Sequence, residues 1–164
     1  MPKKIIAPPS LPAPRGFSHG VLVTGGSLLF LAGQDASDAD GHIVTPGDIV
    51  GQLDQALRSL HAVVHEAGGG MTDIVKLNIF VRDRADYLAQ LHPLGEVFRR
   101  YFGGYYPALA LFEVTGFFQD DALIELEGMA VIGADTVDTS DIVGGAHAAN
   151  LAGTAGEAGQ WTSS

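Results

Sequence analysis

Cysteine is absent from this sequence of 164 residues, which excludes disulfides, thiol nucleophiles and metal centres with Cys ligands. Basic residues are few as well. Nine Lys and Arg stand against 19 Asp and Glu, so the formal net charge is −10. Proteins that bind nucleic acids neutralise phosphates with Lys and Arg. We therefore expect no nucleic-acid partner.

The sequence also lacks a long hydrophobic run. No apolar stretch approaches the roughly 18 residues that a membrane-spanning helix needs. Two lysines near the N-terminus begin like a signal peptide, but four prolines between residues 8 and 14 interrupt any hydrophobic segment. These features predict a cytoplasmic protein with no membrane partner.

Apolar residues make up 46% of the chain, which is enough for the core of one domain. Residues 133–164 differ from the rest, because they are rich in Gly and Ala and contain four acids and no base. Small residues without periodicity bury too little surface to offset their ordering entropy. We expect one domain over residues 1–132 and a flexible acidic tail over 133–164.

Periodicity predicts the first elements of this domain. Two apolar stretches, 19–24 and 27–32, are separated by Gly25-Gly26, a spacing typical of a tight hairpin. Apolar residues then recur at intervals of three and four over 48–67, which predicts an amphipathic helix. Residues 74–81 are rich in β-branched residues and predict a strand.

The second half of the domain continues this alternation of helices and strands. Asp83 is placed to begin a short helical turn, and Pro93 suits the first position of a main helix that ends at Phe102. Two strands follow over 107–116 and 122–132. The order β-β-α-β-α-β-β predicts an α+β fold with two helices packed on one face of a mixed sheet.

Most of the polar patterns that could carry chemistry are better explained without it. His61 and His65 have the spacing of a two-His metal face, but they share the solvent-facing stripe of their helix and no third ligand is suggested. The glycine pairs and triplets match no phosphate-binding fingerprint, and no Ser or His lies in a nucleophile motif. We expect no metal and no cofactor.

Acidic residues inside the two C-terminal strands are the exception. Glu113, Glu125 and Glu127 lie in strongly apolar surroundings, where acids are uncommon. Simple alternation toward solvent would explain each of them. Ile124 and Leu126 suit the core face, so the two carboxyls beside them need water, a partner or a cleft. An apolar cleft favours the neutral carboxyl that a general acid requires.

The strand over 107–116 is apolar on both faces at its start. A strand of this kind is covered on both sides, here by helices and by another subunit. A small sheet whose second face is apolar commonly closes by oligomerisation.

Taken in order, these segments resemble the RidA/YjgF family, whose members are small homotrimers with a chorismate-mutase-like fold. The resemblance extends over nearly all of residues 1–132. It rests on Gly-Phe-Ser-His-Gly-Val at 16–21, Phe-Leu-Ala-Gly-Gln at 30–34, Val-Lys-Leu-Asn-Ile-Phe-Val-Arg-Asp at 75–83, Tyr-Phe-Gly at 101–103, Pro-Ala at 107–108, Phe-Glu-Val at 112–114 and Ile-Glu-Leu-Glu-Gly-Met-Ala at 124–130.

The resemblance implies hydrolysis of reactive imines and enamines in clefts between subunits, where an Arg after the Pro-Ala pair binds the substrate carboxylate. This chain has Leu109 at that position. The family's other polar side chains of the cleft are also replaced, by Phe17, Gly95, Ala110 and Leu111. The positions that match the family are Gly33, Gln34 and Glu127.

These departures replace a cation and several hydrogen-bonding groups with apolar volume, so the resemblance implies an apolar or aromatic substrate. Glu127 would be the catalytic acid or base, and Phe17, Gly33, Gln34, Gly95, Leu109 and Leu111 would bind the substrate. The alternative is a non-catalytic trimer that binds an apolar metabolite or acts as a chaperone-like binding protein. Ribonuclease action, known for some relatives of this kind, conflicts with the net charge.

Overall fold

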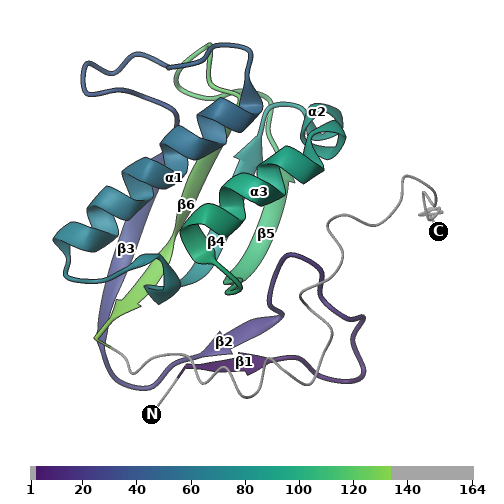
Figure 1. Cartoon of the computed structure of the whole chain (residues 1–164), viewed down its shortest axis with the longest axis vertical. Coiled ribbons are helices and arrows are strands. Elements are labelled where there is room, and N and C mark those ends of the chain that lie inside the picture. The colour runs from purple at the N-terminus through teal and green to yellow at the C-terminus, as the bar shows by residue number, and fades with distance from the viewer. Residues whose placement is uncertain (1–2, 134–164) are drawn as a thin grey trace.

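Helices cover one face of a four-stranded sheet in the computed structural model, which describes residues 3–133 (Figure 1). The strand order is β3 (Ser27–Gln34), β6 (Ile124–Ile132), β4 (Ile74–Val81) and β5 (Ala108–Glu113). Strands β4 and β5 run parallel, whereas β6 is antiparallel to both β3 and β4. The sheet is therefore mixed, and the α+β fold class predicted from the sequence is confirmed.

Three α-helices and one 3₁₀ turn connect these strands. They are α1 (Ile49–Glu66), η1 (Met71–Asp73), α2 (Arg84–Ala89) and α3 (Leu91–Phe102). The Asp48 carboxylate begins α1 by accepting two backbone N–H bonds at 3.0 and 3.1 Å, and Asp83 caps α2 in the same way. Within the described part of the chain, no helix has both the length and the apolar character needed to cross a membrane.

The predicted boundaries hold closely for the central elements. The helix expected over 48–67 and the strand expected over 74–81 are both present. The main helix begins at Leu91, two residues before the predicted start at Pro93. Pro93 is the third helical residue, where a missing backbone N–H costs nothing because first-turn donors have no partner within the helix.

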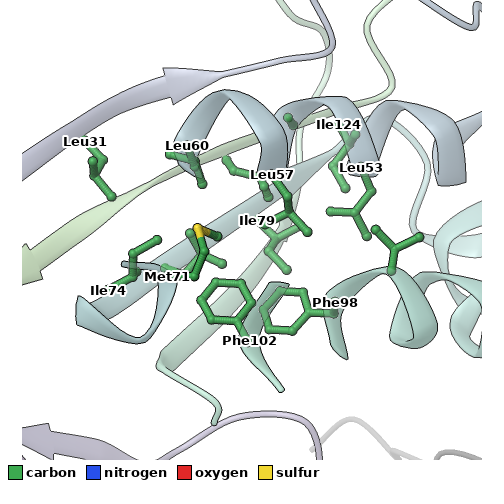
Figure 2. Close-up of a cluster of buried hydrophobic side chains, with 14 of the residues drawn as sticks. Leu31, Leu53, Leu57, Leu60, Met71, Ile74, Ile79, Phe98, Phe102 and Ile124 are labelled. Atoms are coloured by element: carbon green, nitrogen blue, oxygen red, sulfur yellow. The ribbon is translucent and has the colours of Figure 1, made fainter. Parts of the chain in front are cut away.

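The hydrophobic core fills the space between α1, α3 and the sheet (Figure 2). Leu57 and Leu60 from α1 face Ile79 of β4 and Ile124 of β6, and all four are at most 1% exposed. Burial of each such side chain contributes about 1.5–3 kcal/mol to folding. The core thus fixes which face of the sheet each residue of β4 and β6 occupies.

Gln52 is a fully buried polar residue that ties α1 to the start of β6. Its Oε1 accepts the backbone N–H of Leu123 at 2.8 Å, and its Nε2 donates to the carbonyl oxygen of Asp121 at 3.0 Å. Both ends of the amide are therefore satisfied, as a buried polar group requires. This contact holds the residue just before β6 against the N-terminal half of the helix.

The prediction of a hairpin that pairs the strands on either side of Gly25-Gly26 is wrong for the single chain. Strand β2 (Gly20–Leu22) pairs with β1 (Lys4–Ile6), a strand that the sequence did not indicate, and not with β3. Figure 1 shows this two-stranded sheet apart from the main sheet. Gly25 and Gly26 both have the positive φ that a tight hairpin turn uses, at 77° and 79°.

Tertiary contacts explain why the local turn signal fails. Ser18 donates from its backbone N to the carbonyl oxygen of Pro107 at 3.0 Å, and from its Oγ to that of Tyr106 at 2.6 Å. Lys3 is buried and forms an ion pair with Asp73. The Ser18 contacts hold the segment before β2 at β5, the edge strand opposite β3, and the Lys3 ion pair holds the start of β1 at η1.

Strand β6 ends at Ile132, and the domain boundary after this residue stays a prediction. Apart from Gly133, the predicted tail over 133–164 lies outside the described residues.

We predict that Gly128→Ala destabilises the fold. A Cβ at Gly128 would overlap the backbone carbonyl oxygen of Lys76 on the neighbouring strand, so the two central strands would have to separate. The expected loss is about 2 kcal/mol, which corresponds to a fall in Tm of roughly 5–10 °C by thermal unfolding. Gly70→Ala is the matched control, because its Cβ would meet no atom within 4 Å and its φ is −137°. Equal Tm values for the two variants would contradict the prediction.

Candidate functional site

Two carboxyls of β6 lie on the face of the sheet that the helices leave open. Ile124 and Leu126 are fully buried beneath the helices, and the two-residue alternation of the strand turns Glu125 and Glu127 the other way. Both glutamates are half-buried. The face arrangement expected from the sequence is therefore present.

Each glutamate has a defined neighbour on β4. Glu127 pairs in register with Asn78, whose Nδ2 donates to Glu127 Oε1 at 3.1 Å. Glu125 pairs with Phe80, and Phe80 stacks on Phe112 of β5 with ring centroids 5.6 Å apart. The open face thus combines two acids, one amide donor and an aromatic pair.

Gly33 gives Glu125 its position. The pairing of β3 with β6 shifts register between Leu31 and Gln34, so Gly33 lies in an irregular part of the edge strand. A Cβ on Gly33 would overlap the Glu125 carboxyl, which lies directly against the glycine backbone. Only glycine permits this close approach.

The surroundings of Glu125 favour its neutral form. Burial raises the pKa of the Glu125 carboxyl, and the nearby charges of Asp35 and Glu127 raise it further. Lys76, two residues from Asn78 on the same face of β4, has a pKa lowered by burial and partly restored by Glu127. A carboxyl with a raised pKa beside a second, hydrogen-bonded carboxyl is an arrangement that can donate and accept protons.

The other residues proposed from the sequence lie elsewhere. Leu109 and Leu111 of β5 pair in register with Leu77 and Ile79, so they face the helices and pack against the core. Gly95 lies in α3, one of the helices that cover this face of the sheet. The predicted site residues therefore occupy two faces of the sheet.

Phe17 lies near the start of β5, the strand of Leu109 and Leu111. It precedes Ser18, which bridges to Ala108 at the start of β5, and its ring meets His19 edge-on at 5.2 Å. Gly33 and Gln34, in contrast, belong to β3 at the other edge of the sheet. A single chain does not bring the two groups together.

The sequence points to Glu127, and the structure places further polar residues around the two β6 glutamates. The sequence patterns give no role to Glu125, Asp35, Lys76 or Asn78. The signal for two of them was the alternation of Lys76 and Asn78 with buried Leu77 and Ile79, which puts polar groups on the face opposite the core.

The His pair lies far from this face. His61 and His65 are exposed on α1, with ring centroids 5.9 Å apart, and a surface hollow beside them is lined in part by Arg100 and Tyr101. Within residues 3–133, no group of three or more His, Cys, Asp or Glu side chains could hold a metal ion.

Comparison with known proteins places this arrangement in a family. The family model described as Endoribonuclease L-PSP matches residues 9–132. A RutC family protein of Pyrococcus abyssi is 32% identical over 131 residues, covering 79% of this chain and 98% of the relative. A second RutC family protein, from Pyrococcus horikoshii, is 31% identical over 128 residues, covering 78% and 97%.

Solved structures of Rid family proteins have a similar fold. YyfB of Yersinia pestis, described as a Rid family protein of unknown function, is 30% identical with a TM-score of 0.72, covering 80% of this chain and all of that one. RidA from the Antarctic bacterium Psychrobacter sp. is 26% identical with a TM-score of 0.56, covering 79% and 99%. The family match, the relatives and the shared fold together show that this chain belongs to the Endoribonuclease L-PSP family, which includes the RidA/YjgF proteins.

Proposed function

We propose that this protein is a cytoplasmic small-molecule enzyme that transfers a proton or adds water to an imine, enamine or related apolar substrate. Its site is a cleft between the subunits of a homotrimer, and it needs no metal or cofactor. One observation carries the proposal: the Glu125 carboxyl, with its raised pKa, lies against Gly33 and beside Glu127.

The two carboxyls divide the chemistry of imine hydrolysis. Neutral Glu125 donates its proton to the imine nitrogen, which makes the carbon electrophilic. Glu127, oriented by Asn78, accepts a proton from the attacking water as the new C–O bond forms. Proton transfer to nitrogen then allows the C–N bond to break, so that imine and water become ketone and ammonia.

The apolar side chains at the β5 edge support an uncharged or aromatic substrate. Leu109 and Leu111 provide hydrocarbon where the family places polar groups, and Phe17 lies beside the same strand. Loss of a bidentate Arg contact would weaken binding of a carboxylate ligand by about a hundredfold. An aromatic or aliphatic imine without a carboxylate fits this lining better.

The trimer is supported by the open face itself. Leu28, Phe30, Phe112 and Met129 are 57%, 69%, 47% and 41% exposed on this side of the sheet. Apolar patches of this kind mark protein interaction sites. A second copy would cover the patch. It would also bring Glu125 and Gly33 of one subunit toward the residues at the β5 edge of another, which include Leu109 and Phe17.

A binding protein without catalysis is the alternative, and the loss of the family's polar groups at Leu109 and Leu111 favours it. It predicts a rise in Tm with apolar ligands and no turnover. Ribonuclease action, which the family description names, has little support here, because a net charge of −10 repels RNA phosphates.

We expect Glu125→Gln and Glu127→Gln each to lower kcat by about a hundredfold or more, because each removes a proton-transferring group. The substrate is the imine of acetophenone, which an amine oxidase generates in situ from the corresponding primary amine. Turnover is measured as competition with semicarbazide for this imine. Glu113→Gln is the control, because Glu113 is an exposed acid that accepts the Arg84 backbone N–H. Full activity in both β6 variants would sink the catalytic assignment.

The pH dependence should follow Glu125. Because neutral Glu125 is the proton donor, kcat should fall as the pH rises through its raised pKa. Asp35→Asn should move this fall to lower pH, because it removes a charge that raises the pKa. A pH profile that Asp35→Asn leaves in place would contradict the assignment.

The same raised pKa has a consequence for stability. The pKa of Glu125 is higher in the folded state than in the unfolded state. The carboxyl therefore lowers the free energy of unfolding only at pH values above its unfolded-state pKa. Glu125→Gln should therefore raise Tm at about pH 8, and the gain should vanish near pH 3.5, where both forms are neutral. A gain in Tm that is equal at both pH values would show that the substitution acts through packing.

Leu109→Arg should increase competition with semicarbazide for 2-iminopropionate by about tenfold or more, because it supplies a guanidinium for the substrate carboxylate. Leu109→Met is the matched control, since it keeps the volume and adds no charge. Thermal unfolding of both variants checks that the core contact of Leu109 survives. Efficient hydrolysis of 2-iminopropionate by the wild type would show that another group replaces the missing Arg.

A further inference from the structure

We propose that the β1–β2 hairpin of each subunit pairs with strand β3 of a neighbouring subunit, so that the main sheet is extended by an exchanged hairpin. The inference rests on the oligomer in the proposed function and specifies how its subunits are joined.

One edge of strand β3 has no partner strand among residues 3–133. The strand is eight residues long and lies at the end of the sheet, and within residues 3–133 only β6 pairs with it. Its Leu28 and Phe30 are exposed on the open face. A long apolar edge with unpaired backbone groups is a template for another strand, and soluble proteins normally cover or interrupt such edges.

Strand β2 has the residues that would match this edge. In a register closed by Gly25-Gly26, Val23 would face Leu28, Val21 would face Phe30, and Leu22 would face Leu29. All three pairs are apolar, and Leu22 is 56% exposed where it now lies. The sequence therefore specifies a pairing that the single chain leaves unmade.

The fold explains why a chain does not make this pairing with itself. The Ser18 contacts to Tyr106 and Pro107 hold the segment before β2 at the β5 edge. Strands β3 and β5 are three strand spacings apart, about 14 Å. The start of the hairpin is thus held beside β5, and β2 does not lie along the outer side of β3.

A contact between opposite edges of identical subunits is heterologous, and such contacts close into a ring when the rotation allows. Exchange of an identical element between subunits is a low-cost way to build such an oligomer. Gly25 and Gly26, both at positive φ, lie in the hinge between the exchanged hairpin and β3.

The exchange would also assemble the site. Phe17 precedes Ser18, which bridges to Ala108 at the start of β5, whereas Gly33 and its neighbour Glu125 lie at the β3 end of the sheet. Pairing β2 of one subunit with β3 of the next brings the two groups to one subunit boundary. Neither group is complete without the partner copy.

Engineered disulfides test the exchange directly, because the full-length chain has no native cysteine. Val23→Cys and Leu28→Cys are prepared as single variants and as a double variant. The two single variants are mixed, unfolded, refolded together and oxidised, and the products are separated on a non-reducing gel and identified by mass spectrometry. We expect one-to-one heterodimers from the mixture, and covalent dimers and trimers from most chains of the double variant.

A second pair controls for oxidation and folding. Lys4 and Leu22 are register partners in the β1–β2 sheet, so Lys4→Cys with Leu22→Cys should form a disulfide within one chain. Size-exclusion chromatography with light scattering gives the oligomeric state of every variant before oxidation.

Two results would overturn the exchange. A monomeric product in which Cys residues at 23 and 28 are linked within one chain would show that the hairpin closes onto its own β3. No disulfide at these positions, with the control pair oxidised, would show that another segment covers β3. In either case a trimer seen by light scattering would leave the proposed function standing, whereas a monomer would remove the shared cleft as well.

Discussion

The packing of α1 and α3 against the central strands β4 and β6 is the contact on which the rest of the structure depends. Leu57 and Leu60 pack in one buried cluster with Ile79 and Ile124. Because this burial fixes which side chains of each strand face the core, it also fixes the register of the strands. A slip of one residue in β6 would bury Glu125 and expose its apolar neighbours. The position of the acidic pair is therefore a consequence of core packing.

In the proposed function, the open face serves both acid–base chemistry and assembly. Glu125 already has a raised pKa in the single chain, where solvent still reaches much of the sheet. Covering the apolar patch around Phe30 with a second copy would remove more water, which strengthens every electrostatic interaction at the site. In the proposed trimer, the same apolar surface that drives association also keeps the proton donor neutral.

The chain has the family's fold, and in the proposed function its departures from the family pattern lie in the surface that would select a substrate. Gly33 and the β6 glutamates lie on one side of the sheet, and Leu109 and Leu111 lie on the other. In the proposed trimer the two groups would meet across a subunit boundary, so substitutions at Leu109 and Leu111 would leave the acids in place. A family member with altered specificity and retained chemistry is the outcome that this separation permits.

Local patterns in the sequence determined the helix over 48–67, the strand over 74–81 and the two faces of β6, because periodicity reports which side of an element is buried. Only the tertiary structure decided where β2 lies, since the Ser18 contacts outweigh the local turn signal of Gly25-Gly26. It also decided that Glu125 is the acid lying against Gly33. Alternation gives the two glutamates the same face, and only the approach of β3 distinguishes them.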